Sequence, residues 1–215
     1  MCFAMEPSST VSVGNGDVKV FPLEGGLSVH LYETKDPLGD YVQLIETKNA
    51  LLGFDNPAFK KDFGSWGHYI ESLKKPLKLV VISNHANDAG PQWRENAPFA
   101  APNNVKEATT AGASKAISDS LSKNFGAEFV SSLGKINETI PLGQQKLLGS
   151  VNCIILQDGP GIVLVLPEQK AAFMHMLGAD THSIVGSPEQ ADKTIALLKQ
   201  LKKDGVTMVF TDHHK

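Results

Sequence analysis

The first quarter of the chain alternates between short apolar runs and turn-forming residues. The apolar runs cover residues 18–22, 27–32, 41–45 and 50–54. Turn formers such as Gly25-Gly26 separate them, which predicts a meander of antiparallel strands. Residues 1–16 carry turn formers with almost no periodicity, so we expect a flexible N-terminal tail there and a single domain over residues 17–215.

The next part of the chain changes to a helical period. Its large apolar residues recur at steps of four and three, at Phe59, Phe63, Trp66, Ile70 and Leu73. This spacing places them on one side of a helix. We then expect a strand at 77–82 and an extended piece at 98–101. A second helix is predicted from Asn104, with Glu107 in the capping position, to just before Phe125.

The last part returns to strands before a final helix and strand. Apolar runs cover residues 136–142, 151–156, 162–166 and 171–177. Ser187 followed by Pro188 is typical of a helix start, and Gly205 is expected to end that helix. Its buried face is predicted to consist of Ala191, Ile195, Leu198 and Leu201. A strand at 206–210 closes the pattern, which two sheets covered by helices would satisfy.

Composition narrows the class of protein and its partners. The 215 residues are 41% hydrophobic and 20% charged, as in an ordinary globular protein, and the formal net charge is −3. Lys and Arg are scattered along the chain rather than clustered. A broad positive field is therefore absent, and we expect no nucleic-acid partner and no membrane partner.

The two cysteines, Cys2 and Cys153, cannot build a disulfide framework or a thiolate zinc site. We interpret Cys153, inside an apolar run, as a small buried hydrophobe. No run approaches the roughly 18 apolar residues of a membrane helix, and the N-terminus lacks the features of a secretory signal. The chain is therefore predicted to be cytoplasmic.

The most informative segment is residues 79–90, Leu-Val-Val-Ile-Ser-Asn-His-Ala-Asn-Asp-Ala-Gly. An apolar strand runs into a turn that carries Asn84, His85, Asn87 and Asp88. Polar side chains at the mouth of a sheet are where ligands and substrates usually bind. Asn and Asp also occur in such turns only to hydrogen-bond the local backbone, and both interpretations of Asp88 stay open.

Several segments together resemble the metallo-β-lactamase superfamily from about Asp17 to the C-terminus. Residues 40–46 and 50–56 are similar to the opening hairpin of the family, and residues 79–83 to the strand that delivers its His-x-His-x-Asp-His loop. Residues 159–168 resemble a later strand. Gly178-Ala-Asp180 and Thr211-Asp-His-His214 resemble its last two ligand turns. The resemblance implies an α+β fold, a four-layer αββα sandwich of two mixed β-sheets flanked by helices.

The metal loop of that family is degenerate in this chain. Without gaps, Asn84 and Ala86 stand at the first two histidine positions, Asp88 keeps the aspartate, and Ala89 replaces the last histidine. Gln157 stands where the next histidine is expected. The resemblance therefore implies that the metal position built from three histidines has lost all of its ligands.

The second metal position keeps more of its ligands. The resemblance assigns Asp180 to the bridging aspartate and His213 to the terminal histidine, beside Asp88, which is also the catalytic candidate. Two carboxylates and one imidazole can hold a single divalent ion. We expect no cofactor, or one divalent metal such as zinc, iron or manganese.

Each candidate also has an ordinary structural interpretation. Asp180 could brace a loop, and His213 could belong to a solvated chain end. His85 would reach the site only after a one-residue shift of register, and His182 could support Asp180 from behind. His175, which alternates with two methionines, is interpreted as a packed or edge histidine.

Two functions follow from this pattern. The first is a pseudoenzyme or small-ligand-binding protein that uses the ancestral cleft and has lost two-metal hydrolysis. The alternative is a metal-dependent hydrolase of an ester, thioester, lactone or amide, with a mononuclear site at Asp88, Asp180 and His213 that activates water. A flavodiiron-like oxidoreductase is less favoured, because Ala86 stands where that branch needs a carboxylate. The oligomeric state stays open.

Overall fold

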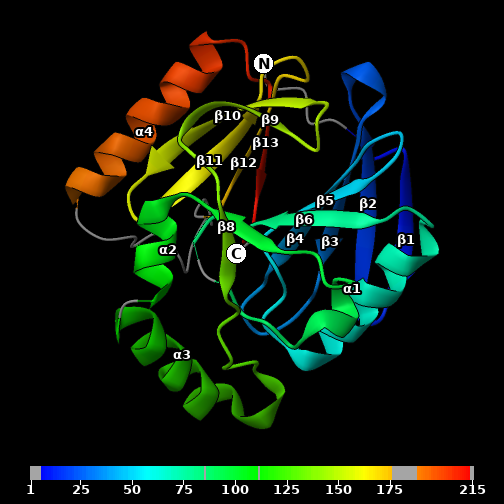
Figure 1. Ribbon diagram of the computed structural model, residues 1–215, viewed down its shortest axis with the longest axis vertical. Coiled ribbons are helices and arrows are strands. Elements are labelled where there is room, and N and C mark those ends of the chain that lie inside the picture. Colours follow the sequence, from blue (N-terminus) through cyan, green and yellow to red (C-terminus); the bar gives the residue numbers. More distant parts are fainter. Residues whose placement is uncertain (1–5, 85, 111, 176–187, 214–215) are drawn as a thin grey trace.

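Two β-sheets pack face to face in the computed structural model, which describes residues 6–84, 86–110, 112–175 and 188–213 (Figure 1). Among these residues, the first sheet has eight strands that neighbour one another in chain order. They are β1 (Ser9–Val13), β2 (Gly16–Pro22), β3 (Ser28–Glu33), β4 (Tyr41–Glu46), β5 (Leu51–Phe54), β6 (Leu77–Val81), β7 (Phe99–Ala101) and β8 (Ile136–Thr139). Pairing is antiparallel from β1 to β5 and parallel from β5 to β8.

The second sheet has five strands in the described part of the chain, in the order β13-β12-β11-β10-β9. They are β9 (Gly143–Leu147), β10 (Val151–Asp158), β11 (Gly161–Leu166), β12 (Ala171–Met174) and β13 (Met208–Thr211). β13 lies parallel to β12, and the other pairs are antiparallel. Both sheets are therefore mixed, as the resemblance implied.

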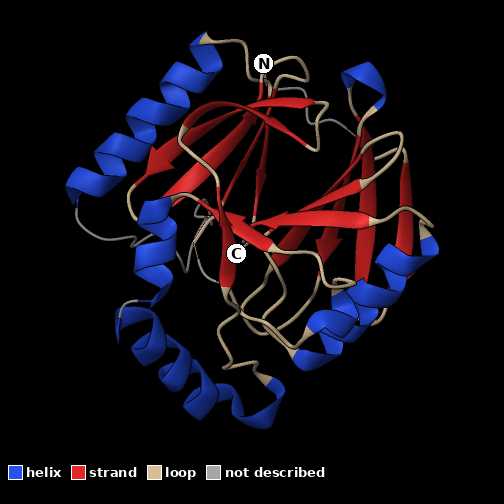
Figure 2. Cartoon of the chain, in the orientation of Figure 1, coloured by secondary structure: helices blue, strands red, loops and turns tan. Residues whose placement is uncertain are grey.

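Helices lie on the outer sides of both sheets (Figure 2). They are α1 (Lys60–Ser72), α2 (Asn103–Thr110), α3 (Gly112–Phe125) and α4 (Pro188–Lys203), with short 3-10 turns at Glu24–Gly26 (η1), Pro91–Trp93 (η2) and Gly126–Glu128 (η3). On α1, Trp66 is buried and stacks on Tyr32 of β3 with ring centroids 5.2 Å apart. On α4, Leu201 is buried against the second sheet. The αββα sandwich is confirmed.

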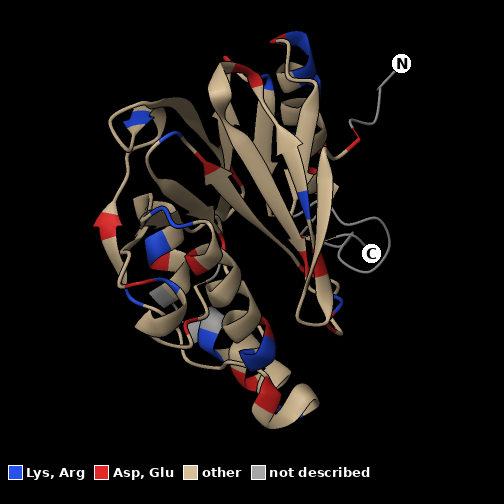
Figure 3. Ribbon diagram, turned by 90° about the vertical axis from the view of Figure 1, so that its right-hand side faces the viewer, with Lys and Arg blue, Asp and Glu red and all other residues tan. Residues whose placement is uncertain are grey.

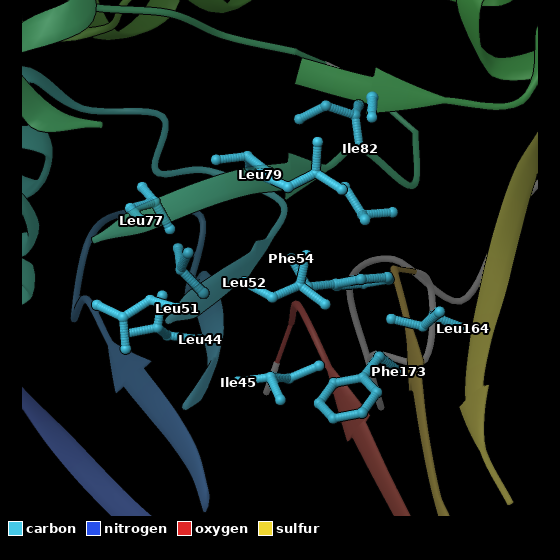
Figure 4. Close-up of a cluster of buried hydrophobic side chains, with 14 of the residues drawn as sticks. Leu44, Ile45, Leu51, Leu52, Phe54, Leu77, Leu79, Ile82, Leu164 and Phe173 are labelled. Carbon is cyan, nitrogen blue, oxygen red and sulfur yellow. The ribbon is translucent and has the colours of Figure 1, made fainter. Parts of the chain in front are cut away.

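The core between the sheets consists of aromatic and aliphatic side chains that face each other (Figure 4). Phe54 of the first sheet and Phe173 of the second lie with ring centroids 5.7 Å apart, and both are fully buried. Leu52 and Leu164 belong to the same cluster. Burial of this apolar area from both sheets is the dominant favourable term for the sandwich.

The structure corrects several boundaries. Ser9–Val13, expected within an unstructured tail, forms β1 and pairs with β2. β9, which the sequence analysis did not predict, carries polar residues at most positions and joins the sheet through its pairing with β10. The helix predicted from Asn104 to Phe125 is present as two helices, α2 and α3.

The face that α4 turns to the sheet is only partly the predicted one. Leu198 and Leu201 pack against the sheet as predicted, together with Leu197, whereas Ala191 and Ile195 are exposed. Residues 194, 197, 198 and 201 also lie on one side of a helix, so periodicity alone could not choose between the two faces.

Charged residues of both signs are spread over strands and helices (Figure 3). Neither sign forms a continuous block along the ribbon, in agreement with the scattered sequence pattern. No helix among the described residues is long and apolar enough to cross a membrane.

Candidate functional site

Polar residues gather where strands of both sheets end. Asp55 directly follows β5, His175 directly follows β12, and Asp212 directly follows β13. β12 and β13 are parallel neighbours, so their carboxyl ends meet at one edge of the second sheet. The end of β5 brings Asp55 from the first sheet to the same place.

Asp55, His175 and Asp212 form a tight buried cluster, which we call the Asp–His–Asp centre. One possible ligand atom from each residue lies within 4.8 Å of the other two. His175 Nδ1 is 2.8 Å from Asp212 Oδ2 and 3.5 Å from Asp55 Oδ2. The exposed fractions are 3% for Asp55, 7% for His175 and 3% for Asp212.

Ser83 holds Asp55 in place. The Ser83 backbone N–H donates to Asp55 Oδ1 at 2.7 Å, and the Ser83 hydroxyl donates to Asp55 Oδ2. Ser83 follows β6, the parallel neighbour of β5. The carboxylate orientation is therefore fixed by the adjacent strand end.

A second histidine–carboxylate pair lies against the centre. His213 Nδ1 is 2.9 Å from Asp40 Oδ1, and both residues are buried. The His213 ring meets the His175 ring nearly perpendicularly, with centroids 4.9 Å apart. Asp40 and His213 also form an isolated antiparallel bridge. The start of β4 and the end of β13 thereby join the two sheets beside the centre.

The two carboxyl groups of the centre have opposite tendencies to ionise. Burial raises the pKa of Asp55, but hydrogen bonds with Asp212, His175 and Ser83 outweigh it and hold that pKa below its usual range. Burial and the Asp55 carboxylate raise the pKa of Asp212 well above its usual value. Of the two carboxyl groups, Asp55 therefore ionises more readily than Asp212.

The centre has the chemistry of a single metal site. Two carboxylates and one imidazole suit zinc, manganese or iron(II), and these donors converge on one space. Among the described residues, no Lys or Arg forms an ion pair with Asp40, Asp55 or Asp212. A divalent ion bound here would add a positive charge that no Lys or Arg provides, and it could lower the pKa of a coordinated water.

Asp88 is placed differently, in an ion pair with Arg94. Asp88 Oδ2 is 2.8 Å from Arg94 Nη2, and Trp93 Nε1 donates to Asp88 Oδ1 at 2.9 Å. The Gly90 backbone N–H also donates to Oδ1, at 3.0 Å. Burial raises the pKa of Asp88, but the bonds from Arg94, Trp93 and Gly90 outweigh burial and lower it. Asp88 therefore has a protein cation as its partner.

Comparison with known proteins decides the fold. No protein-family model matches the sequence, and no curated protein matches it significantly. Solved structures match over almost the whole chain. A structure of the DIM-1 metallo-β-lactamase aligns over 96% of this chain and 92% of its own, with a TM-score of 0.63 and 13% identity. This chain has the metallo-β-lactamase fold.

Two further metallo-β-lactamase structures support this assignment. The enzyme from Erythrobacter litoralis covers 96% of this chain and 88% of its own, at TM-score 0.58 and 15% identity. FIM-1 from Pseudomonas aeruginosa, in its mono-zinc form, covers 92% of this chain and 88% of its own, at TM-score 0.59 and 13% identity. At such low identity the likeness concerns the fold alone.

Three positions that the resemblance compares with family histidines make local contacts. The carbonyl of Asn84 accepts a bond from the Thr109 hydroxyl at 3.3 Å. Ala86 is buried, and its carbonyl accepts the N–H of Gly134 at 2.5 Å. The exposed Gln157 amide of β10 donates to the carbonyl of Gly159 at 3.1 Å. None of the three residues carries an imidazole.

Of the ligand set predicted from sequence, His213 lies beside the Asp–His–Asp centre, whereas Asp88 contacts Arg94 and is not part of that centre. Asp180 lies outside the described residues, as do His85 and His182. The set Asp88, Asp180 and His213 therefore stays a prediction.

The sequence pattern does not mark Asp55, His175 and Asp212 as a site. Asp55 belongs only to the segment 50–56 that resembles the family's opening hairpin, and His175 is interpreted as a packed or edge histidine. A usable signal was present, because each of the three is the first residue after a β-strand. This signal does not show that β12 pairs with β13, or that the end of β5 approaches these two strands.

A separate groove runs along α1. It has a volume of about 280 Å³ and lies between α1 and the segment that contains η2. Its lining is Lys60, Phe63, Gly64, Gly67, His68, Glu71, Ala89, Gln92 and Trp93. This lining does not include any residue of the Asp–His–Asp centre.

Proposed function

We propose that this chain is a divergent protein of metallo-β-lactamase fold that has lost two-metal hydrolysis and serves as a pseudoenzyme or small-ligand-binding protein using the ancestral cleft. The observation that carries the proposal is the ion pair of Asp88 with Arg94. Both side chains are only 13% exposed. A carboxylate already neutralised by a guanidinium at this depth is a poor ligand, because a metal would have to displace the Arg94 and Trp93 bonds.

The mapped histidine positions support the same proposal. Asn84, Ala86 and Gln157 offer no ring nitrogen. The Asn84 carbonyl accepts from the Thr109 hydroxyl, the Ala86 carbonyl accepts from the Gly134 N–H, and the Gln157 amide donates to the Gly159 carbonyl. Loss of these ligands removes the first metal position, and the Arg94 ion pair occupies a ligand of the second. Two-metal activation of water requires both positions about 3.5–4 Å apart.

The test is hydrolysis by the full chain in the presence of added zinc, manganese or iron(II). The substrates are a chromogenic β-lactam, a p-nitrophenyl ester, a thioester and a lactone. We expect rates equal to those of the same buffer with metal, and equal for the wild type, Asp88→Asn and a control variant at an exposed site, Lys115→Ala. Metal-dependent turnover that is lost in Asp88→Asn and kept in Lys115→Ala would overturn the proposal.

A mononuclear metal-dependent hydrolase is the second candidate. The observation in its favour is the Asp–His–Asp centre, where three ligand types suited to zinc lie within 4.8 Å. The sequence predicts Asp88, Asp180 and His213 as the metal ligands of such a hydrolase. The Asp–His–Asp centre offers other ligands, and His213 lies beside them. Under this candidate, Asp55, His175 and Asp212 would hold the metal and orient it toward a bound water.

The two candidates differ in which substitutions change turnover. Hydrolysis at the centre requires that turnover disappears in Asp212→Asn and His175→Gln while it survives in Asp88→Asn. Hydrolysis through the predicted set requires loss in Asp88→Asn, Asp180→Ala and His213→Ala. Absence of turnover from all of these proteins, each confirmed as folded by circular dichroism, supports the pseudoenzyme.

A further inference from the structure

We propose that the Asp–His–Asp centre binds one divalent cation whose role is structural: it joins the ends of β5, β12 and β13 and so holds the two sheets together. The proposal goes beyond the loss of hydrolysis and does not depend on it. The ion class is zinc, manganese or iron(II), because the donors are two carboxylates and one imidazole.

The first argument is charge. Three carboxyl groups, of Asp40, Asp55 and Asp212, are buried near one another, and in the described chain their ion-pair partners are the histidines His175 and His213 rather than a Lys or Arg. Asp88, by contrast, is paired with Arg94. Buried charges in proteins are paired or coordinate metals. In the described structure, the Asp–His–Asp centre is where buried carboxylates and a histidine lie close enough together to coordinate one metal ion.

The second argument is preorganisation. Ser83 fixes both oxygens of Asp55, and the perpendicular His213 ring packs against the His175 ring. Asp212 Oδ1 is buried and makes no hydrogen bond among the described residues. A buried acceptor without a donor costs about 1–3 kcal/mol, and an ion beside Asp212 would satisfy it. Ligands held by surrounding groups in this way are typical of metal sites.

The third argument is location. Asp55 belongs to the first sheet, whereas His175 and Asp212 belong to the second. Direct bonds between the sheets occur at the same point: Tyr41 N–H donates to the Asp212 carbonyl at 2.6 Å, and Gln43 Nε2 to the Thr211 carbonyl at 2.8 Å. An ion here would therefore link the two sheets at a point where they already form direct hydrogen bonds. Ligands at least 93% buried match a closed structural site better than an open catalytic one.

The experiment measures metal content and stability in the full chain. Protein purified without a chelator or an affinity-tag metal is analysed by elemental mass spectrometry, then stripped with chelator and titrated with zinc or cobalt(II). We expect about one ion per chain. Zinc at a hundredfold excess over its Kd is expected to raise the Tm of the stripped protein by about 5–10 °C.

Variants locate the ion. Asp212→Asn and His175→Gln should each weaken zinc binding by about a hundredfold or more, because removal of a ligand exceeds the 10–100-fold effect of supporting groups. Asp62→Asn is the matched control, since Asp62 is also buried but is not part of the centre, and its zinc affinity should equal that of the wild type.

Folding of the ligand variants does not limit the test, because wild-type protein provides a second readout. Histidine ring NMR signals of the stripped chain should shift on zinc addition, and bound cobalt(II) should show the visible absorption of a low-coordinate site. No stoichiometric metal and no zinc-dependent rise in Tm would overturn the proposal. Equal affinity in Asp212→Asn, His175→Gln and the wild type would overturn it as well.

The outcome is separate from that of the proposed function. A bound ion without turnover supports both proposals. Metal-dependent turnover that disappears in Asp212→Asn would overturn the structural role, because the ion would then be catalytic. Turnover that disappears only in Asp88→Asn would overturn the loss of hydrolysis and leave the structural ion in place.

Discussion

The Asp88 carboxylate and the Arg94 guanidinium form an ion pair of 2.8 Å, and the same guanidinium lies 4.6 Å from the centroid of the Phe99 ring. Arg94 also donates to the Ala97 carbonyl. A planar guanidinium can serve all three partners at once, which Lys could not do. The aspartate retained from the metal-loop pattern thus obtains its positive partner from a side chain six residues further along the chain.

Removal of Arg94 should leave Asp88 charged and poorly solvated. We expect Arg94→Met to lower the free energy of unfolding by about 2–4 kcal/mol at pH 7, measured by urea denaturation. The pair lowers the folded-state pKa of Asp88, so its contribution is present above the unfolded value of 3.8 and is lost as the pH falls through the folded value. The penalty should therefore be smaller at pH 3 than at pH 7.

Two further variants test that explanation. Asp88→Asn combined with Arg94→Met should recover part of the loss, because no buried charge is then left unpaired. Lys115→Ala removes an exposed ion pair with Asp119 and should cost less than about 0.5 kcal/mol. If Arg94→Met were as mild as Lys115→Ala, the Asp88–Arg94 pair would not be a significant stabilising contact.

The two glycines within α1 should respond oppositely to alanine. A Cβ at Gly67 would lie 3.0 Å from the Cα of Trp93, a backbone atom that cannot easily move, whereas a Cβ at Gly64 would meet nothing within 4 Å. We expect Gly67→Ala to destabilise by about 1–3 kcal/mol through overpacking. Gly64→Ala should stabilise by up to about 1 kcal/mol through helix propensity. Thermal unfolding measures both, and equal effects would contradict the close approach of α1 to η2.

Asp62 should make stability depend on pH. Burial and the nearby Asp36 raise the pKa of Asp62 to about 6, above its usual value of 3.8. The folded state therefore binds more protons than the unfolded state between about pH 4 and 6, and stability falls as the pH rises through that window. In Asp62→Asn this fall in stability should be smaller. At pH 7 the variant should be more stable than the wild type by about 1–2 kcal/mol, which is part of the free energy that corresponds to the pKa shift at about 1.36 kcal/mol per pKa unit.

Urea denaturation at pH 4, 5, 6 and 7 measures the Asp62 effect. The difference between the variant and the wild type should shrink steadily from pH 7 to pH 4, because Asp62 becomes protonated in the folded state below about pH 6. A constant difference across the whole range would mean that the substitution acts through packing or through the helix start rather than through ionisation.

Cys153 should be inert in the folded chain. It is 2% exposed, and burial raises the pKa of its thiol to about 11, so little thiolate forms at pH 8. In a Cys2→Ser background, which leaves Cys153 as the chain's only thiol, a disulfide reagent should react only at the rate of unfolding. Rapid reaction in native buffer would show that β10 opens readily.

The fold was predictable because its signals are local and repeated. The steps of four and three from Phe59 to Leu73 correspond to α1, and the short runs separated by turn formers correspond to β2, β3, β4 and β5. β1 and β9 escaped prediction because their side chains are mostly exposed or partly exposed. Such strands gain their stability from hydrogen bonds to a neighbouring strand rather than from an apolar pattern.

The candidate site was less predictable than the fold. Sequence spacing located a polar loop at residues 84–90 and singled out Asp88, yet the orientation of that side chain depends on Arg94 and Trp93, which follow in an irregular segment. His175 and Asp212 are 37 residues apart and meet only because β12 and β13 pair in parallel.

The sequence by itself predicted most of the strands and the helix α1, because these depend on residue type and short-range period, and the family resemblance implied the αββα class. Tertiary structure alone decided which polar groups meet. The buried centre of Asp55, His175 and Asp212 arises from strand ends brought together by sheet pairing, whereas the salt bridge that neutralises Asp88 forms within the segment between β6 and β7. The physical reason is that ligand geometry is a long-range property, set by how two sheets pack rather than by any single stretch of chain.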